Sequence, residues 1–563
     1  MTLRPIMSAL TALKSLKSPK TALAAALASA LAFTTAPALA ANPIAAITPL
    51  WTFNHNVAPT IGRSAEIPLW DAATSALWIV GGNGLDVLDL SGNRIQTFTT
   101  TAFGNINSIA ISGNTLALAF TNSSNAGLPG TVQFFDTQTF LSQGANAALL
   151  GGVQVGAVPD MLTWTPDGRR LLVANEGERQ SNSNNPVGSL SLITVDRTSS
   201  FSTNVNTAGF GAFDGQEAAL RAAGVRIQAG VAASVAFEPE YIAIAPGGQF
   251  AHVTMQENNS IAELNLQTGQ FTRILPLGAK DYSLPGNAID TSDLDGIVGN
   301  FRNVPVKGLY MPDSILSYSA GGQVFFVMAN EGDAAVDDSD IIRLGNSAVT
   351  LDPGVFPNAA ELKQNSNLGR LNIVRDGATG DGSITNMTEI YTLGGRSFSI
   401  RDANGNLVFD SGNQLEVQAL AAGVYVDNRS DDKGVEPEGV ALFTLAGRTL
   451  AFIGLERTTR SAVAIYDITD PANASFLQML VSVDASVLRP EGLVAFENAG
   501  RYFLAVAHES TADSIIAGGL SNRTVLYEIS PVPEPSTYAL MLLGAAGVVA
   551  FARRRSNSKA TRA

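Results

Sequence analysis

Acidic residues recur along the chain in one sequence context that could bind metal ions. Five segments place a proline directly before Asp or Glu, continue into a short apolar run and a polar turn, and reach a second acid after the next apolar run. The first acids of these segments are Asp160, Glu240, Asp313, Glu438 and Glu491. The second acids are Glu176, Glu257, Glu331, Glu456 and Glu509. Oxygen ligands in a chain without Cys favour Ca²⁺ or Mg²⁺ over zinc.

The spacing of each acidic pair predicts where the carboxylates meet. In an antiparallel hairpin the start of the first strand lies beside the end of the second. The two acids of each segment should therefore lie at the same end of their hairpin, the first acids closest to a central channel. We predict that the first acids bind Ca²⁺, with Mg²⁺ as the alternative. The second acids and His508, which precedes Glu509, would surround that site.

A structural explanation competes with the metal site. A single acid of this kind could cap backbone N–H groups or pair with a basic neighbour such as Arg457 or Arg489. Ten carboxylates at one end of a fold are a different case, because like charges raise one another's pKa and reduce stability unless cations lie among them. We therefore expect at least one bound divalent ion.

The acidic segments belong to a longer repeat that predicts the fold. Each copy has short apolar strands separated by Gly-rich turns, and two weaker copies at 67–90 and 106–136 lack the Pro-acid start. One such unit cannot bury both of its faces alone. Seven copies predict an all-β, seven-bladed β-propeller of the WD40/YVTN type, with the strand near 47–53 completing the last blade.

Unequal spacing between the copies implies long insertions. They fall at about 197–237, 267–310, 333–367 and 376–435. Loops carried by a rigid scaffold are common places for binding residues. The insertions are therefore the candidates for the functional face of the propeller.

Both ends of the chain carry targeting features. Residues 1–40 combine basic residues, an alanine-rich apolar run and a small-x-small site ending at Ala40, which is typical of a signal peptide cut by signal peptidase. At the other end, Pro533, Glu534 and Pro535 precede an uncharged run at 538–552 and three arginines. That run would reach roughly 22 Å as a helix, short of a bilayer core of about 30 Å.

The order of motif, apolar run and arginines resembles the PEP-CTERM sorting signal of Gram-negative bacteria, which exosortases recognise and process. Together, the N-terminal features, the repeat and this resemblance predict a signal peptide at 1–40, a propeller at 41–530, a sorting signal with a short transmembrane helix at 531–555 and a cytoplasmic tail at 556–563. The resemblance also implies an exported protein of the cell surface or extracellular matrix. Before processing, the helix would anchor the chain transiently in the inner membrane.

Further stretches carry a second resemblance. They are Asp-Tyr-Ser-Leu-Pro-Gly-Asn at 281–287, Ala-Asn-Glu-Gly-Asp-Ala at 329–334 and Gly-Gly-Arg-Ser-Phe-Ser-Ile at 394–400, and 427–439 supports the same match. They resemble the choice-of-anchor I family of bacterial surface proteins, in which one propeller-like body is combined with different C-terminal anchors. The resemblance implies architecture and location. Arg396 and Arg429 lie in these stretches and are candidates for anion binding.

Composition restricts the remaining functions. The absence of Cys excludes cysteine nucleophiles and thiolate metal sites, and the sequence has no H-E-x-x-H, G-x-S-x-G or P-loop motif. The two terminal segments carry nine of the 35 basic and one of the 49 acidic residues, so residues 41–530 have a formal net charge of −22. Such a body should repel nucleic acid.

Two functions stay open at this point. The first, which we favour because the sequence shows no complete catalytic set, is a surface module that binds an extracellular polymer, a protein or calcium. The second is a metal-dependent extracellular hydrolase of phosphate esters or lactones, in which ions at the acidic face activate water.

Overall fold

The computed structural model describes residues 42–60, 63–100, 103–181, 184–198, 200–334, 338–509 and 522–533. Compact packing divides the chain into two units, Ile47–Ile529 and a second unit formed by Met1–Ala46 with Ser530–Ala563. In the second unit, the Val532 N–H donates to the carbonyl of Pro43. The predicted signal peptide, Glu534, Pro535 and the apolar run at 538–552 lie outside the described residues. Within the described residues, no helix is long and apolar enough to cross a membrane.

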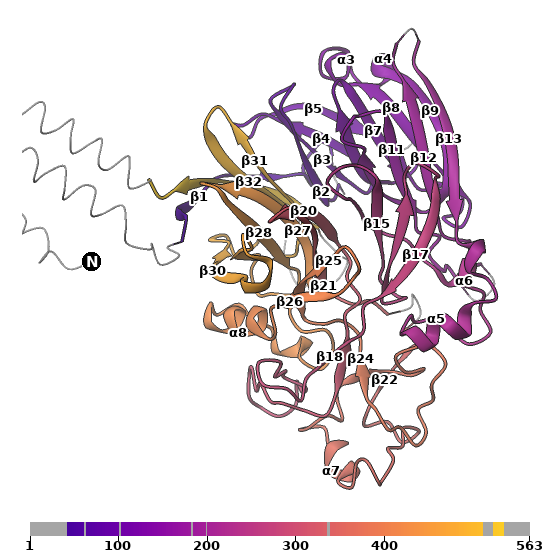
Figure 1. The fold of residues 1–563 in the computed structure, drawn as a ribbon. Coiled ribbons are helices and arrows are strands. Elements are labelled where there is room, and N and C mark those ends of the chain that lie inside the picture. Colours follow the sequence, from indigo (N-terminus) through magenta and orange to yellow (C-terminus); the bar gives the residue numbers. More distant parts are fainter. Residues whose placement is uncertain are drawn as a thin grey trace, which may run out of the picture. The chain divides into compact units, whose positions relative to one another are not determined.

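Four-stranded antiparallel sheets dominate the structure (Figure 1). Seven such sheets occur among the described residues, and we number them in chain order. The first contains β2 (Ile67–Asp71), β3 (Ala76–Gly81), β4 (Gly84–Leu88) and β5 (Arg94–Thr99); the second contains β6 (Ile106–Ser112), β7 (Thr115–Phe120), β8 (Pro129–Asp136) and β9 (Leu149–Ala157). The third contains β10 (Pro159–Trp164), β11 (Arg170–Asn175), β12 (Ser189–Asp196) and β13 (Ser202–Gly209); the fourth contains β14 (Ile242–Ile244), β15 (Phe250–Met255), β16 (Ser260–Asn265) and β17 (Gln270–Pro276).

The remaining sheets follow the same plan, with insertions. The fifth contains β20 (Ile315–Ala320), β21 (Gln323–Asn330), β25 (Ser397–Asp402) and β26 (Leu407–Asp410); the sixth contains β27 (Pro437–Leu445), β28 (Arg448–Leu455), β29 (Ala462–Asp467) and β30 (Ser475–Val481). The seventh has the order β1 (Ile44–Asn54), β33 (Arg523–Pro531), β32 (Arg501–His508) and β31 (Pro490–Asn498). The strand near 47–53 thus lies in the last sheet, where the repeat places it.

Neighbouring sheets contact one another mainly through their first strands. β2 contacts β6, β6 contacts β10, β10 contacts β14, β14 contacts β20, β20 contacts β27 and β27 contacts β31. β31 also contacts β2, so the seventh sheet lies against the first. This arrangement confirms the predicted all-β propeller architecture. The number of blades in one closed ring stays a prediction.

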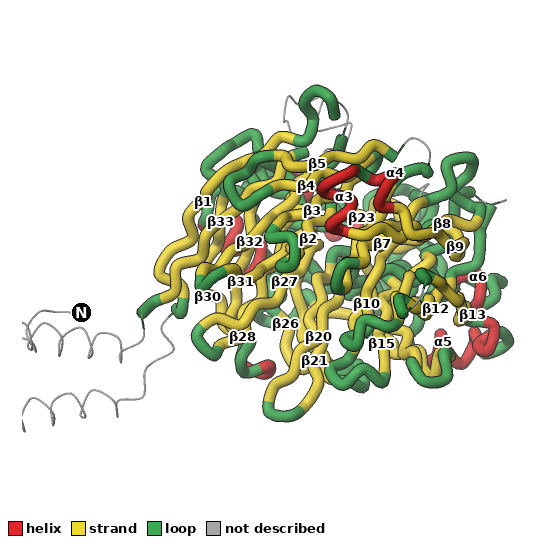
Figure 2. Tube along the Cα trace, turned by 90° about the horizontal axis from the view of Figure 1, so that it is seen from above, coloured by secondary structure: helices red, strands yellow, loops and turns green. Residues whose placement is uncertain are grey.

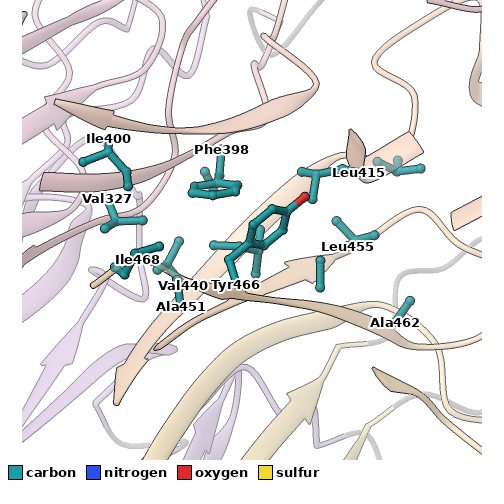
Figure 3. Close-up of a cluster of buried hydrophobic side chains, with 14 of the residues drawn as sticks. Val327, Phe398, Ile400, Leu415, Val440, Ala451, Leu455, Ala462, Tyr466 and Ile468 are labelled. Carbon is teal, nitrogen blue, oxygen red and sulfur yellow. The ribbon is translucent and has the colours of Figure 1, made fainter. Parts of the chain in front are cut away.

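Burial explains why the sequence forms these strands. A sheet packed between two others is covered on both faces, so its inner strands read as nearly continuous apolar runs. Every residue of β3 and β7 is buried, whereas the outer strands β5 and β30 have no buried residue. Figure 3 shows one of the resulting clusters between two sheets, where Phe398 of β25 packs near Tyr466 of β29.

Within the described residues, helices are few and short (Figure 2). The α-helices are α3 (Thr137–Gln143), α4 (Ala145–Ala148), α5 (Glu217–Ala223), α6 (Ala233–Ala236), α7 (Ala359–Leu362) and α8 (Gln414–Ala421). The 3₁₀ turns are η1 (Gly211–Phe213), η2 (Asp427–Arg429) and η3 (Pro471–Asn473). Apart from α3, α4 and η3, they lie in the predicted insertions.

The insertions after β17 and β21 share a core of their own. They contribute β18 (Ala279–Asp281), β19 (Lys307–Leu309) and β24 (Tyr391–Thr392) to one small sheet, and β22 (Ile341–Arg343) and β23 (Asn372–Val374) to another. Their apolar side chains, among them Tyr282, Leu344 and Ile373, form one buried cluster. These insertions are therefore a folded layer and not separate loops.

A buried polar cluster joins the seventh sheet to the first. His55 Nδ1 lies 2.8 Å from Asp86 Oδ2, and His55 Nε2 lies 2.9 Å from Thr524 Oγ1. Arg63 Nη1 donates to Asp86 Oδ1 at 2.7 Å. The order of Thr, His and Asp is that of a hydrolase triad, but His55, Asp86 and Thr524 are each 0% exposed. We therefore assign this cluster to structure.

Candidate metal centre

Irregular strand pairing positions three of the first acids. In the pair β10–β11, Pro159 lies opposite Asn175 and Met161 opposite Ala174, so Asp160 has no partner. Glu438 of β27 and Glu491 of β31 fall in equivalent shifts of register. A bulge of this kind bends the strand and re-aims the side chain of the extra residue.

The backbone before these acids is also unusual. Val158, Met311, Glu436 and Arg489 have positive φ angles of 46°, 43°, 48° and 56°, and each directly precedes the proline of a Pro-acid pair. Side chains other than Gly rarely adopt this left-handed conformation, least of all a β-branched one. The same strained turn at four equivalent positions indicates that the sheets hold the Pro-acid pair in one defined orientation.

The structure brings all five first acids into one electrostatic cluster. Burial raises the pKa of each of them, and neighbouring carboxylates raise it further. For Glu240, these neighbours include Glu257 and Asp313; for Glu438, they include Glu491. Burial, followed by the charge of another carboxylate, raises the pKa of Asp160 to about 6.

The second acids belong to the same cluster. Burial is again the main cause of the raised pKa of Glu176, Glu257 and Glu331, and it raises the pKa of Glu456 to about 8. Glu509 lies 3.5 Å from Arg489, and its negative charge raises the pKa of Glu491. The second acids therefore lie in the same electrostatic cluster as the first, and their place around a bound metal ion stays a prediction.

The cluster contains further acids that the repeat did not predict. They are Glu66, Glu178, Glu238, Asp333 and Glu436, each of which raises the pKa of one of the predicted acids. Glu66 directly precedes β2 in a copy that lacks the Pro-acid start, so the only sequence signal for Glu66 was its position before a first strand. Burial, followed by the charge of Glu178, raises the pKa of Glu238 to about 7.

A cavity of about 220 Å³ opens among the acids of the third, fourth and fifth sheets. Its carboxylate lining consists of Asp160, Glu176, Glu178, Glu238, Glu240, Glu257, Asp313, Asp333 and Asp340. Glu240 is 6% exposed, and within the described residues its Oε2 has no hydrogen-bond partner. A buried carboxylate oxygen without a partner is costly. The cavity has room for a hydrated cation, because a water molecule occupies about 30 Å³.

Basic side chains compensate another part of the cluster. Lys433 Nζ lies 2.8 Å from Glu331 Oε1 and 3.2 Å from Glu436 Oε2. Arg457 and Arg489 lie 3.0 and 3.4 Å from the carboxylate of Glu456. The alternative explanation, in which an acid pairs with a basic neighbour, thus applies to Glu456. It does not account for the buried carboxylate of Glu240.

The two predicted anion-binding arginines make contacts within the chain. Arg396 is buried and donates to the carbonyls of Asp290, Ser430 and Asp432 at 3.0, 2.9 and 2.6 Å. Arg429 pairs with Asp432 and Glu436 at 2.9 and 2.5 Å. Both guanidinium groups already hold the insertion segment, and their role toward an external anion stays a prediction.

His508 lies buried in β32. Its Nε2 is 2.8 Å from Ser461 Oγ and its Nδ1 is 3.1 Å from the carbonyl of Arg523. Burial lowers the pKa of His508 to about 4. The imidazole is therefore neutral near pH 7 and links neighbouring strands, and it is not among the residues that line the cavity.

We expect the His508 imidazole to titrate near pH 4, and its contribution to stability to fall on acidification. The unfolded chain takes up this proton near pH 6.5, so between pH 6.5 and 4 the unfolded state binds more protons than the folded state. The free energy of unfolding therefore decreases as the pH falls through this range. NMR of the imidazole nitrogens measures this titration, and His508→Gln identifies the signal. A midpoint near 6.5 for that signal would contradict the buried, neutral state.

The comparisons with known proteins agree with this architecture. A model of the choice-of-anchor I domain matches residues 66–471. The chain belongs to the choice-of-anchor I family. A model of the PEP-CTERM protein-sorting motif matches residues 531–556, which implies an exported protein processed by an exosortase. Both resemblances seen in the sequence are thereby confirmed for this choice-of-anchor I protein.

Other comparisons add little to the family match. No curated protein matches the chain. The β-propeller domain of Myceliophteria thermophila Cps50 (Swd1) is 10% identical with a TM-score of 0.40, and the match covers 83% of this chain and 97% of that one. Kuenenia stuttgartiensis hydrazine synthase is 10% identical with a TM-score of 0.42, covering 85% and 99%.

Proposed function

We propose that this choice-of-anchor I protein is a binding module of the cell surface or extracellular matrix, and that its cavity beside Glu240 takes up a divalent cation. Ca²⁺ is the expected ion and Mg²⁺ the alternative. The observation that carries the proposal is the buried Glu240 carboxylate, whose Oε2 has no hydrogen-bond partner within the described residues and lies among acids of three sheets.

The chemistry of the cavity fits a hard cation. Ca²⁺ takes six to eight oxygen ligands from carboxylates, carbonyls and water. Asp160, Glu240 and Glu257 offer carboxylates from two neighbouring sheets, and amides such as Gln256 and Asn258 also line the cavity. Folding raises the pKa values of these acids, which means that keeping them charged in the folded state costs free energy. A bound divalent cation would reduce this cost, and without a cation the acids must take up protons.

A binding role suits the site better than hydrolysis. A phosphate ester needs positive donors besides the metal ion. Two arginines line the cavity: Arg226 donates to Asp340 and Asp376 at 3.1 and 3.0 Å, and Arg179 donates to Ser339 at 3.2 Å. Arg396 and Arg429 are engaged in the insertion layer. A bound cation would instead offer open coordination positions to an oxygen-rich ligand, such as an extracellular polymer or a protein.

The proposed location follows from the termini. The sorting motif would anchor the chain in the inner membrane of a Gram-negative bacterium until an exosortase processes it, after signal peptidase has removed residues 1–40. The acidic body would then act at the surface or in the matrix, where calcium is available.

Calcium binding by the purified protein tests the proposal. Isothermal titration calorimetry should detect Ca²⁺ binding to the wild-type chain, and Glu240→Gln should weaken it by at least roughly tenfold, which corresponds to about 1.4 kcal/mol. Glu497→Gln is the matched control, because Glu497 is an exposed acid of β31. Equal affinities for the wild type and Glu240→Gln would refute the site.

A further inference from the structure

The outer strand of the third sheet leaves one side of its backbone unpaired. β13 pairs with β12, and within the described residues no strand pairs with its other side. Figure 1 shows β13 at the outer edge of its sheet. The free N–H and C=O groups of an edge strand are a template on which another strand can pair.

β13 lacks the irregularity that protects other edges of this protein. Its pairing with β12 is regular over the whole strand, from Ser189 opposite Gly209 to Asp196 opposite Ser202. A shift of register interrupts the pairing of five other outer strands, namely β5, β9, β17, β26 and β30. Bulges, charges and prolines are the usual means of blocking an edge. β13 has none of them, because residues 198–213 include no proline and no charged side chain.

The space beside β13 is open. A groove of about 310 Å³ is lined by residues 206–209 of β13 and by residues 268–271 at the turn into β17. Asn204 and Asn206 are exposed on the same face of the strand, and within the described residues their side chains make no hydrogen bond. An added strand would therefore find both free backbone groups and free amides.

The sequence of β13 matches itself in the antiparallel direction. Residues 203–207 read Thr-Asn-Val-Asn-Thr, which is the same from either end. When two such strands pair antiparallel with Val205 opposite Val205, each threonine faces a threonine and each asparagine faces an asparagine. Cross-strand threonine pairs stabilise a sheet, and an amide both donates and accepts hydrogen bonds.

We propose that the edge of β13 is a self-association site, at which two copies of the protein pair β13 with β13 antiparallel about a two-fold axis at Val205. A two-fold contact uses the same surface on both copies, which a self-matching strand provides. The net charge favours this place as well. Residues 41–530 carry a net charge of −22, so two copies repel each other, and the uncharged segment 198–213 brings no like charges face to face.

Charged residues in place of the two asparagines test the pairing and its direction. In Asn204→Lys with Asn206→Lys, each new ammonium faces another across the axis, and dimerisation should weaken by at least roughly tenfold. In Asn204→Lys with Asn206→Asp, each ammonium faces a carboxylate of the other copy, and the dimer should persist. Sedimentation velocity over a concentration series measures the dissociation constants.

A matched control separates the site from a general effect of added charge. Gln154→Lys with Ser475→Lys adds the same two charges at exposed positions of β9 and β30, and it should leave the dissociation constant unchanged. Melting curves show that each variant is folded. A wild type that is monomeric at every concentration overturns the inference. An equal loss of dimer in the Lys–Lys and Lys–Asp variants overturns it too.

The inference is independent of the proposed cation site. Measurements in EDTA remove any contribution of Ca²⁺, and β13 contributes only residues 206–209 to its own groove and none to the acidic cavity. Dimerisation in EDTA supports the contact between copies whether or not Glu240 binds an ion.

Discussion

Excess Ca²⁺ is expected to raise the melting temperature of the wild-type protein, and Glu240→Gln with Glu257→Gln to abolish the rise. A ligand that binds only the folded state stabilises it by mass action, by about 2.7 kcal/mol at one hundred times the dissociation constant. Both carboxylates line the cavity, and the Oε2 atoms of both have no hydrogen-bond partner within the described residues. Gln keeps the shape of Glu while removing the charge that attracts the cation.

Melting curves in EDTA and in excess Ca²⁺ distinguish this result from a purely structural role of the acids. If the two acids only connect neighbouring sheets, the double variant loses the same stability in both conditions and calcium shifts neither protein. Parallel curves in Mg²⁺ identify the preferred ion. Glu497→Gln, which alters an exposed acid of β31, should respond to Ca²⁺ as the wild type does.

Asp86→Asn is expected to destabilise the propeller body by about 3–5 kcal/mol, because it breaks a fully buried ion pair from one side. Asp86 accepts from Arg63 at 2.7 Å and lies 2.8 Å from His55 and 3.2 Å from Arg94, and Arg63 and His55 are buried. Without the carboxylate, the Arg63 guanidinium keeps its charge in the interior with no opposite charge beside it. The cluster also joins the seventh sheet to the first, so the loss should weaken the contact between the two ends of the sheet series.

Urea denaturation measures this effect, and an exposed ion pair supplies the control. Glu528 and Arg501 pair at 2.8 Å on the surface, where water screens the charges. Glu528→Gln should therefore cost little stability. A loss for Asp86→Asn no greater than that for Glu528→Gln would show that the buried cluster does not hold the sheets together.

The repeat predicted much of the candidate site, because its signals are local. A proline, an acid, an apolar strand and a turn recur within short stretches, and these stretches form the hairpins from β10–β11 to β31–β32. Hairpin geometry then places Asp160 and Glu176 at the same end of one sheet. Four of the acids that the repeat missed, Glu178, Glu238, Asp333 and Glu436, stand two residues from predicted ones, and this recurring offset was the available signal in the sequence.

Charge compensation could not be predicted in the same way. Lys433 lies 102 residues from Glu331 along the chain, and Arg226 lies 150 residues from Asp376. Nothing in the sequence near these residues indicates their partners. The contacts of Arg396 were hidden in the sequence for the same reason, because its carbonyl partners lie 34 and 106 residues away along the chain.

By itself, the sequence determined the sorting motif and the repeated strand units, and it predicted the export signal and the acids at one end of the repeats, because each depends on residues close together in the chain. Only the tertiary structure decided which carboxylates are neutralised and which are not. It places Lys433, Arg457 and Arg489 beside Glu331 and Glu456, and it leaves the Glu240 oxygen buried in an acidic cavity. The physical reason is that Coulomb energy depends on distance in space and on burial, and folding sets both.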